Sequence, residues 1–315
     1  MMDERRTAKG GTYSFRRGEP MEFAYFDPPR PAAGTRSVGI ALDTLRLRID
    51  GLDDALADAL VERYGPYAET SPAAEDSALV VRFAREARDY FIEPPRVAEF
   101  NPVWLAVLGA RVRFLGYRLA GWFDVAGARG EILLSRGTYE PELRALENFI
   151  RCAVAWCAAE RGGALVHAAS VVRNEKGYLF YGESGAGKST LSAVNTRGRV
   201  VSDDLSLVLP RPGGGLDLVG SPFRGTYEEG EPVLGRFPLA AGFRIVKDVK
   251  AEVRAAPRVV AFGQLVGNLT FVADAFRERP DLFASIEAAF AGVPLLHLHF
   301  KKDDSYWDAI DAAGL

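Results

Sequence analysis

The stretch of sequence that decides the fold is Tyr178-Leu179-Phe180-Tyr181-Gly182-Glu183-Ser184-Gly185-Ala186-Gly187-Lys188-Ser189-Thr190. Its first four residues form a short apolar run, which is typical of a buried strand, and residues 189–194 suit a helix. Between these segments, Gly182 to Ser189 satisfies the pattern Gly-x-x-x-x-Gly-Lys-Ser in full. The sequence therefore predicts a strand, a phosphate-binding loop and a helix, in that order.

The residue types of this loop suit a nucleoside triphosphate. Glycines let the backbone curl so that successive N–H groups point inward at phosphate oxygens. The start of the helix adds a partial positive charge, Lys188 supplies a cation for the β- and γ-phosphates, and the Ser189 hydroxyl can bind Mg²⁺. We therefore expect ATP and Mg²⁺ as cofactors, with the nucleotide held by Gly182, Glu183, Ser184, Gly185, Ala186, Gly187, Lys188, Ser189 and Thr190. The alternative is an ordinary glycine-rich turn.

Two adjacent carboxylates, Asp203 and Asp204, follow a strand-like run at residues 199–201. A phosphate-loop protein can place a carboxylate at such a strand end to serve Mg²⁺ or its water ligands. We expect Asp203 to serve the metal with Ser189, and Asp204 to accept a proton from an attacking hydroxyl. The two roles are exchangeable between the aspartates, and the alternative for both is a turn that leads into the next segment.

The remaining patterns predict two domains. The first ~40 residues are rich in Gly, Pro and Arg and are expected to be irregular. Residues 44–50 alternate as a half-buried strand does, and residues 52–64 form an amphipathic helix that Gly65-Pro66 ends. A long amphipathic helix over residues 140–160 follows a β-rich middle. We place an α+β N-terminal domain, a candidate for partner recognition, at residues 1–138 and a nucleotide-binding domain at residues 139–315.

Within the second domain, a hairpin turn is expected at residues 174–177, directly before the strand that leads into the loop. The later patterns predict a hairpin of residues 207–209 with 216–219, helices near residues 259–273 and 281–291, a strand at residues 295–300 and a last short helix.

Composition narrows the class of protein. The chain has 315 residues, of which 48% are hydrophobic and 26% charged, the profile of a soluble globular protein. Its net charge of −3 gives no electrostatic case for nucleic acid, and no apolar run reaches the ~18 residues of a membrane span. No secretory signal is expected at the N-terminus. Cys152 and Cys157 point in different directions on the predicted long helix, so we expect free thiols and a cytoplasmic protein.

Three segments in this order resemble a known family. They are Val166-His167-Ala168-Ala169-Ser170, the loop at residues 182–190, and Val201-Ser202-Asp203-Asp204. The order is similar to that of HPr kinase/phosphorylase, and more closely to that of HPr-kinase-related proteins of bacterial gene clusters. Those relatives also carry motifs like Gly220-Ser221-Pro222-Phe223-Arg224-Gly225 and tend to end in a segment like residues 298–307.

The resemblance spans residues 164–310 and implies a fold like that of phosphoenolpyruvate carboxykinase. This is an α/β (α+β) P-loop kinase domain with a mixed β core, not a doubly wound parallel sheet. His167 matches a histidine that assists the catalytic acid, and its alternative is a hydrogen-bonded core histidine. Arg224 resembles an arginine typical of the related kinases, and its positive charge is expected to stabilise the transferring phosphoryl group or the acceptor site. The alternative is a surface arginine.

Other charged residues of the second domain are expected to be solvated or structural. Lys247 and Lys250 are expected to be solvated, and the alternative is that they contact the nucleotide. Lys301 and Lys302 are expected at the surface, and the alternative is that they face the substrate. His297 and His299 share one face of a strand without an evident third ligand, so we expect them to be structural. No convincing counterpart exists of the loop with which HPr kinase performs phosphorolysis and docks its partner, which argues against HPr as the substrate.

The resulting hypothesis is an ATP- and Mg²⁺-dependent kinase that transfers the γ-phosphoryl group to a serine or other hydroxyl of a protein or peptide. Its expected catalytic residues are Asp204, Asp203, His167, Lys188 and Arg224. The alternatives are an NTPase, a non-catalytic ATP-binding regulatory module and a small-molecule kinase. We expect no nucleic-acid or membrane partner, and a homo-oligomer is compatible with the sequence.

Overall fold

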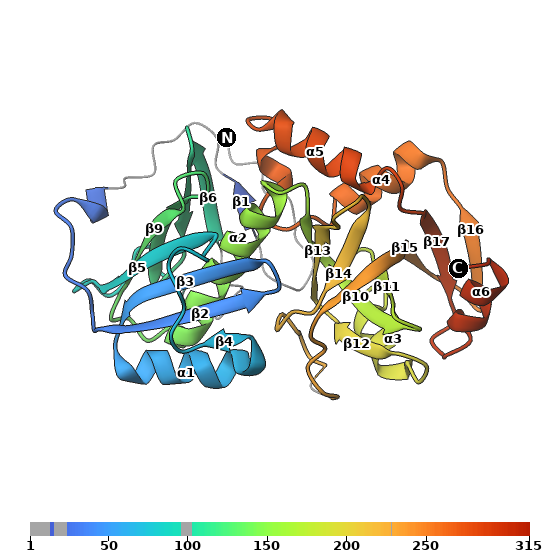
Figure 1. Cartoon of the computed structure of the whole chain (residues 1–315), viewed down its shortest axis with the longest axis horizontal. Coiled ribbons are helices and arrows are strands. Elements are labelled where there is room, and N and C mark those ends of the chain that lie inside the picture. Colours follow the sequence, from blue (N-terminus) through green and yellow to red (C-terminus); the bar gives the residue numbers. More distant parts are fainter. Residues whose placement is uncertain (1–12, 16–23, 96–102, 228) are drawn as a thin grey trace. The chain divides into compact units, whose positions relative to one another are not determined.

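The structure is a computed structural model of the chain, and it describes residues 13–15, 24–95, 103–227 and 229–315. The described chain divides into two compact units, one that ends at Cys157 and one that spans Ala158–Leu315. Helix α2 (Glu142–Ala159) leads from the first unit into the second (Figure 1). The boundary predicted from the sequence, between residues 138 and 139, precedes this helix, whereas the compact units divide near its end.

The first unit is built on a nine-stranded mixed sheet with the order β1-β6-β7-β8-β9-β5-β3-β2-β4. Its strands are β1 (Tyr13–Phe15), β2 (Arg36–Leu42), β3 (Leu45–Leu52), β4 (Ala68–Glu69), β5 (Leu79–Arg85), β6 (Val103–Leu108), β7 (Arg111–Leu115), β8 (Leu119–Asp124) and β9 (Arg129–Leu134). The strand expected at residues 44–50 is confirmed as β3. The expectation of an irregular start was wrong for β2, which pairs antiparallel with β3 through a turn at Asp43.

Helix α1 (Asp54–Tyr64) has the ends that its sequence predicts. The Asp53 side chain accepts a hydrogen bond from the Leu56 amide at 3.0 Å and caps the helix. Gly65, with φ 51°, ends it. Leu56, Leu60 and Tyr64 are buried, so the helix covers apolar surface with the stripe that its periodicity indicated.

The second unit has a mixed sheet in which five strands close into a circuit. The pairs β11–β10, β10–β13, β13–β14 and β14–β15 are antiparallel, and the parallel pair β15–β11 closes the circuit. Strand β12 pairs with β10, while β17 and β16 extend the sheet beyond β15. The strands are β10 (Ala164–Arg173), β11 (Lys176–Tyr181), β12 (Arg199–Ser202), β13 (Leu205–Pro210), β14 (Leu216–Val219), β15 (Arg236–Lys247), β16 (Glu252–Ala255) and β17 (Leu295–Phe300). The chain is therefore a mixed α/β protein of the α+β kind, with many strands and six helices among the described residues.

The hairpin expected before the glycine loop is confirmed. Strands β10 and β11 pair from Arg173–Lys176 to Ala168–Tyr181, so the turn has two residues. These are Asn174 with φ 51° and Glu175 with φ 55°. Two consecutive residues of positive φ are what a type I′ turn requires, and this turn matches the twist of the flanking strands.

Helices cover both faces of the β11–β15–β17 region. Aromatic and aliphatic residues of these strands, among them Phe180, Phe243 and Leu298, share one core cluster with Leu191 of α3 (Lys188–Val194) and with Tyr306 and Trp307 of α6 (Tyr306–Ala312). On the other face, the Tyr181 hydroxyl donates to the carbonyl of Ala261 in α4 (Arg258–Val266) at 3.4 Å. Helix α5 (Pro280–Phe290) follows the predicted pattern, but α4 ends earlier than the predicted residue 273.

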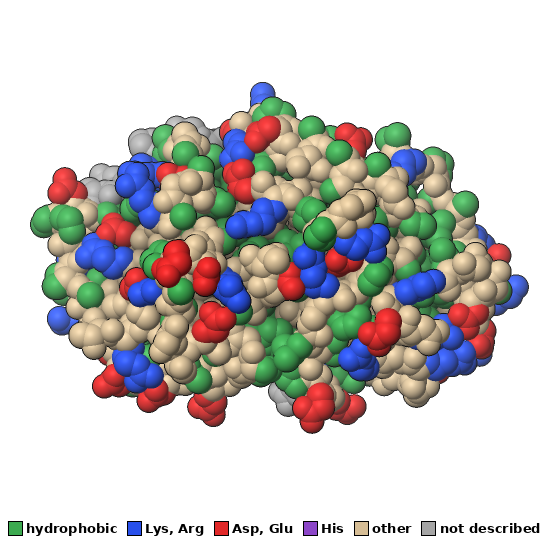
Figure 2. Space-filling model, viewed as in Figure 1, with side chains coloured by type: hydrophobic (Ala, Val, Ile, Leu, Met, Phe, Trp, Pro, Cys, Tyr) green, Lys and Arg blue, Asp and Glu red, His purple; other side chains and the backbone are tan. Residues whose placement is uncertain are grey.

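Acidic and basic side chains are interspersed on the face of the molecule seen in Figure 2. Several form local ion pairs, such as Arg279 with Glu160 at 2.7 Å. None of the helices in the described ranges combines the length and the apolar character that spanning a membrane demands. Cys152 and Cys157 are buried free thiols, as expected.

Candidate functional site

The glycine loop lies between the end of β11 and the start of α3, as the sequence predicts. Gly185 has φ 77° and Gly187 has φ 116°, values at which a side chain would strain the backbone. The amide of Ala186 donates to the Glu183 carbonyl at 3.0 Å, which makes the loop a tight turn. Helix α3 has only seven residues. Any anion-binding capacity therefore depends mainly on the loop amides and Lys188.

Lys188 is buried, with 7% of its surface exposed, at the mouth of this loop. Its ammonium donates to the carbonyl of Gly182 at 2.9 Å and, more weakly, to that of Glu183 at 3.4 Å. Burial lowers the pKa of Lys188 below its ordinary value, while the charge of Asp204 acts in the opposite direction. The loop thus holds a cation in a partly desolvated position, where it interacts strongly with an anion.

His167 and Asp204 meet beside Lys188. His167 Nε2 lies 3.4 Å from Asp204 Oδ1, and each side chain is about one third exposed, at 34% and 31%. The separation is longer than a normal charge-assisted hydrogen bond, so the two groups interact mainly through charge. Burial and the nearby Lys188 lower the pKa of His167 below its ordinary value of 6.5, and Asp204 opposes this shift. The imidazole is therefore held neutral at physiological pH, where it can accept a proton.

Strand register brings these residues together. In β10, His167 pairs with Leu205, the residue after Asp204. Its neighbour Ala168 pairs with Tyr181, the residue before the glycine loop. One short segment of β10 therefore lies between the start of the loop and the end of the acid pair.

Asp203 faces a different way from Asp204. It is 3% exposed, and its carboxylate accepts hydrogen bonds from the amides of Gly225 at 2.7 Å, Thr226 at 3.0 Å and Tyr227 at 3.2 Å. The Thr226 hydroxyl donates to it as well, at 3.3 Å. Asp203 thus fixes the loop at residues 225–227, while Asp204 is the member of the pair that lies against His167.

Arg224 belongs to the same loop but donates to backbone carbonyls. Its guanidinium donates to Gly230 at 3.0 Å, to Glu231 at 2.9 Å and to Glu229 at 3.2 Å. It also reaches the carbonyls of Val200 and Val201 in β12, both at 3.4 Å. In this structure Arg224 therefore connects its own loop to β12, and its predicted role at the phosphoryl group stays a prediction.

The residues fit Mg²⁺ in the manner usual for phosphate-loop proteins. Among the described residues, no three or more His, Cys, Asp or Glu side chains converge on one point, so an all-protein metal cage is absent there. Mg²⁺ bound with a nucleotide needs only one or two protein oxygens, with phosphates and water as its other ligands. The exposed Ser189 hydroxyl and Asp204 offer such oxygens. The predicted metal role of Asp203 would require it to exchange some of its four hydrogen bonds.

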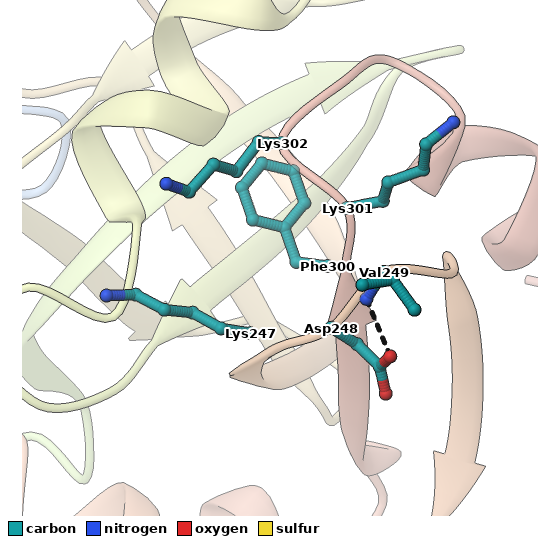
Figure 3. A pocket seen from close by; sticks show the side chains of 6 residues that line it. All are labelled: Lys247, Asp248, Val249, Phe300, Lys301 and Lys302. Atoms are coloured by element: carbon teal, nitrogen blue, oxygen red, sulfur yellow. Dashed lines mark hydrogen bonds between the residues drawn. The ribbon is translucent and has the colours of Figure 1, made fainter.

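The sequence predicts solvated surface positions for Lys247 and Lys302, and the structure places both at a pocket. The pocket has a volume of about 340 Å³ and is lined by Lys247, Asp248, Val249, Phe300, Lys301 and Lys302 (Figure 3). Lys247 and Phe300 come together because the strands that end at these residues pair in parallel. The sequence does not show which strands are neighbours, so it could not predict this pocket.

The two C-terminal histidines have separate partners. His297 Nε2 lies 2.8 Å from Gln264 Oε1, and His299 Nδ1 lies 2.8 Å from Asp248 Oδ2. They therefore do not form a common metal site, and their expected structural role agrees with these contacts. Lys250 is exposed and does not line the pocket.

Comparison with known proteins adds no family assignment. No family model matches the sequence, and no curated protein is significantly similar to it. The geometry of the glycine loop, Lys188, His167 and Asp204 is therefore the basis on which a function can be inferred.

Proposed function

We propose that the chain is an ATP- and Mg²⁺-dependent kinase with a P-loop kinase domain of the HPr-kinase type. It transfers the γ-phosphoryl group to a hydroxyl of a protein or peptide. The observation that carries this proposal is that Lys188 of the glycine loop lies close enough to His167 and Asp204 to interact with both through charge, while these two side chains contact each other. A phosphate-loop site that only binds nucleotide does not need a neutral imidazole and a carboxylate at that point.

The roles follow from the chemistry of phosphoryl transfer. The acceptor oxygen forms a bond to the γ-phosphorus while the bond to the β,γ-bridging oxygen breaks and ADP leaves. Lys188 and the loop amides stabilise the negative charge that develops on the phosphate oxygens. Asp204, with His167 beside it, takes the proton that the acceptor hydroxyl loses.

Two of the predicted catalytic residues have positioning roles in this proposal. Asp203 fixes the loop at residues 225–227 through its backbone amides, and Arg224 connects this loop to the carbonyls of residues 229–231 and of β12. The loop in turn packs on the acid pair, because a Cβ on Gly225 would lie 3.0 Å from Cβ of Asp204. The Ser189 hydroxyl and a carboxylate of the acid pair would hold Mg²⁺, which when bound neutralises charge on the β- and γ-phosphates.

The class of acceptor rests on the resemblance to HPr kinase/phosphorylase. A protein or peptide hydroxyl is therefore the substrate to test first, and a small molecule that carries a hydroxyl is the next.

Transfer of label from γ-labelled ATP to proteins and peptides of a cell lysate tests the proposal. We expect labelled product with the wild-type chain and Mg²⁺, and loss of labelling in Lys188→Ala. Labelling that continues unchanged in Lys188→Ala shows that the glycine loop does not hold the donor.

Hydrolysis of the nucleotide is the second candidate function. One observation favours it: about one third of the surfaces of His167 and Asp204 is open to solvent, so water can reach the position of the acceptor. Phosphate release at a rate that no added protein or peptide changes, without any labelled product, would favour the NTPase. Tight ATP binding without turnover would favour the regulatory module.

A further inference from the structure

The pocket of Figure 3 shares one edge of the sheet with the glycine loop. Lys247 is the last residue of β15, and Phe300 is the last residue of β17. Both strands run parallel to β11, whose end leads into the loop. The carboxyl ends of parallel neighbours lie along the same edge of a sheet, so the pocket and the glycine loop share that edge.

The pocket and the loop are also in contact. A Cβ atom added to Gly187 would lie 3.4 Å from Cδ1 of Phe300 and 3.5 Å from its Cε1. The ring of Phe300, which is 1% exposed, therefore lies under both the loop and the pocket. The glycine loop and the pocket are therefore adjacent at Phe300.

The positions of the strands set the direction of the ligand. Strand β11 lies between β10 on one side and β15 on the other. His167 comes from β10, and Asp204 precedes β13, which pairs with β10. The pocket lies on the β15 side. A triphosphate whose reacting end meets His167 and Asp204 therefore extends its other end towards Lys247 and Phe300.

The lining chemistry suits the nucleoside end of such a ligand. Phe300 gives an apolar floor and Val249, which is 87% exposed, gives an apolar rim. Lys247 and Lys302 point to the same side of the pocket, and Lys301 points to the opposite side (Figure 3). Ammonium groups beside an apolar floor can contact the face of a heteroaromatic ring and the hydroxyls of a sugar.

Both of these lysines are available for a ligand. Within the part of the chain that the structure describes, no ion pair engages Lys247 or Lys302. The one lining carboxylate, Asp248, accepts from the Val249 amide at 2.6 Å and pairs with His299. Lys301, by contrast, is paired with Asp303 at 2.9 Å.

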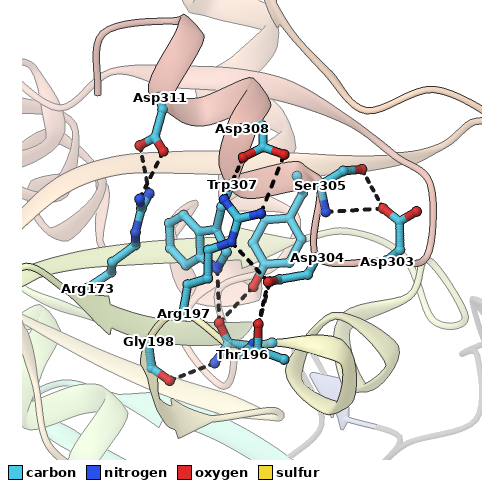
Figure 4. A network of polar contacts seen from close by, with 12 residues as sticks. Arg173, Thr196, Arg197, Gly198, Asp303, Asp304, Ser305, Trp307, Asp308 and Asp311 are labelled. Carbon is cyan, nitrogen blue, oxygen red and sulfur yellow. Dashed lines mark hydrogen bonds and ion pairs between the residues drawn. The ribbon is translucent and has the colours of Figure 1, made fainter.

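The loop after Lys302 is hydrogen-bonded to the residues that follow α3 (Figure 4). Asp304 accepts hydrogen bonds from Thr196, including one from its hydroxyl, and from Arg197 Nε at 3.1 Å. Trp307 Nε1 donates to Asn195 Oδ1 at 3.0 Å. Helix α3 begins at Lys188, so these hydrogen bonds connect the segment that follows the phosphate loop to the loop that carries Lys302. The backbone of Lys302 is held at φ 45°, a conformation that a lysine rarely adopts.

We propose that this pocket binds the base and ribose of the nucleotide whose phosphates occupy the glycine loop, with Lys247 and Lys302 as its polar contacts. The proposal rests on the function proposed above and adds the residues that distinguish a nucleoside triphosphate from a bare polyphosphate.

Calorimetric titration of the full chain in the presence of Mg²⁺ tests it with two ligands. One is adenylyl imidodiphosphate, which keeps the nucleoside and resists hydrolysis, and the other is inorganic tripolyphosphate. We expect the wild type to bind the nucleotide at least about tenfold more tightly than tripolyphosphate. Lys247→Ala and Lys302→Gly should remove most of this difference and change tripolyphosphate affinity by less than about twofold.

The variants are chosen so that a folding defect is recognisable. Glycine prefers the positive φ of position 302, so Lys302→Gly removes the ammonium without straining the backbone. Lys250→Ala is the matched control, because Lys250 is an exposed lysine that does not line the pocket, and it should behave as the wild type.

Three outcomes overturn the proposal in distinguishable ways. Equal losses for both ligands assign the lysines to phosphate, and unchanged affinities give the pocket no part in binding. In either case, loss of both ligands in Lys188→Ala would leave the proposed function standing. A wild-type chain that binds neither ligand overturns the nucleoside site and the proposed function together.

Discussion

His167 Nε2 lies 3.4 Å from Asp204 Oδ1, although the glycine loop and α3 separate the two residues along the chain. The Lys188 ammonium is close enough to lower the pKa of His167, and Asp204 raises it. The three groups therefore form one electrostatic unit. Substitution of one member should therefore change the ionisation of the others.

The first prediction concerns the ionisation of His167. Replacing Lys188 by Met removes a neighbouring positive charge and should raise the pKa of His167, whereas Asp204→Asn should lower it. The C–H resonances of the imidazole, followed by NMR over a pH titration, measure both shifts. The chain has three histidines, so variants of His297 and His299 assign the signal. Shifts of the opposite sign, or none, would show that the three groups are not adjacent in solution.

The second prediction is the pH dependence. The pKa of His167 in the folded chain lies below the ordinary 6.5, so the unfolded chain binds the proton more readily. Stability from this group is therefore fully present above about pH 6.5 and is lost as the pH falls through the folded-state pKa.

Phosphoryl transfer should decline over the same acidic range, because protonated His167 cannot assist Asp204. Denaturant unfolding and rate profiles of wild type and His167→Gln check it, and an acidic decline that is identical in the variant would assign it to another group.

The third prediction distinguishes a positioning role of Arg224 from a catalytic one. Arg224→Ala removes hydrogen bonds to the carbonyls of Glu229, Gly230 and Glu231 and should lower the free energy of unfolding by about 1–3 kcal/mol. If the Arg224 side chain only positions the loop, transfer per folded molecule falls modestly and Arg224→Lys recovers little stability. Unchanged stability with abolished transfer would instead support the phosphoryl-stabilising role that the sequence predicts.

A fourth prediction concerns the network of hydrogen bonds between the end of α3 and α6 (Figure 4). Asn195 Oδ1 accepts from the Tyr306 hydroxyl and from Trp307 Nε1, each at 3.0 Å, and both aromatic side chains are fully buried. Asn195→Ala leaves two buried donors unsatisfied and should cost about 2–3 kcal/mol of unfolding free energy.

Arg199→Ala is the control for this fourth change. Its ion pair with Glu175 is largely exposed, at 53% and 79%, so its loss should cost less than about 1 kcal/mol. Thermal unfolding of both variants gives the comparison. Equal losses would mean that the buried network does not stabilise the C-terminal helix as described.

Local patterns in the sequence predicted much of the second unit. The two-residue turn at Asn174 and Glu175 sets the register of β10 on β11, and this register places His167 near the start of the glycine loop. The strand before the loop and the helix after it follow from periodicity and glycine placement. Their physical determinants lie within a few residues of one another, which is why sequence patterns reveal them.

Long-range contacts were not predictable in the same way. Asp203 and Asp204 are neighbours of the same residue type, and only the folded loop at residues 225–227 shows that its amides bind Asp203. Likewise, Lys247 and Lys302 resemble any exposed lysines until the parallel pairing of β15 with β17 brings their strand ends together. Tertiary contacts, not local preference, assign these side chains their surroundings.

The most direct test of the central claim is mass spectrometry of the products formed from ATP, Mg²⁺ and candidate protein or peptide acceptors. The account predicts phosphate on an acceptor hydroxyl with the wild-type chain. It predicts a rate lower by about 10²–10⁴-fold with Asp204→Asn, and no product with Lys188→Ala. Phosphorylated product that forms equally with all three chains, or ATP turnover that yields only free phosphate, would contradict it.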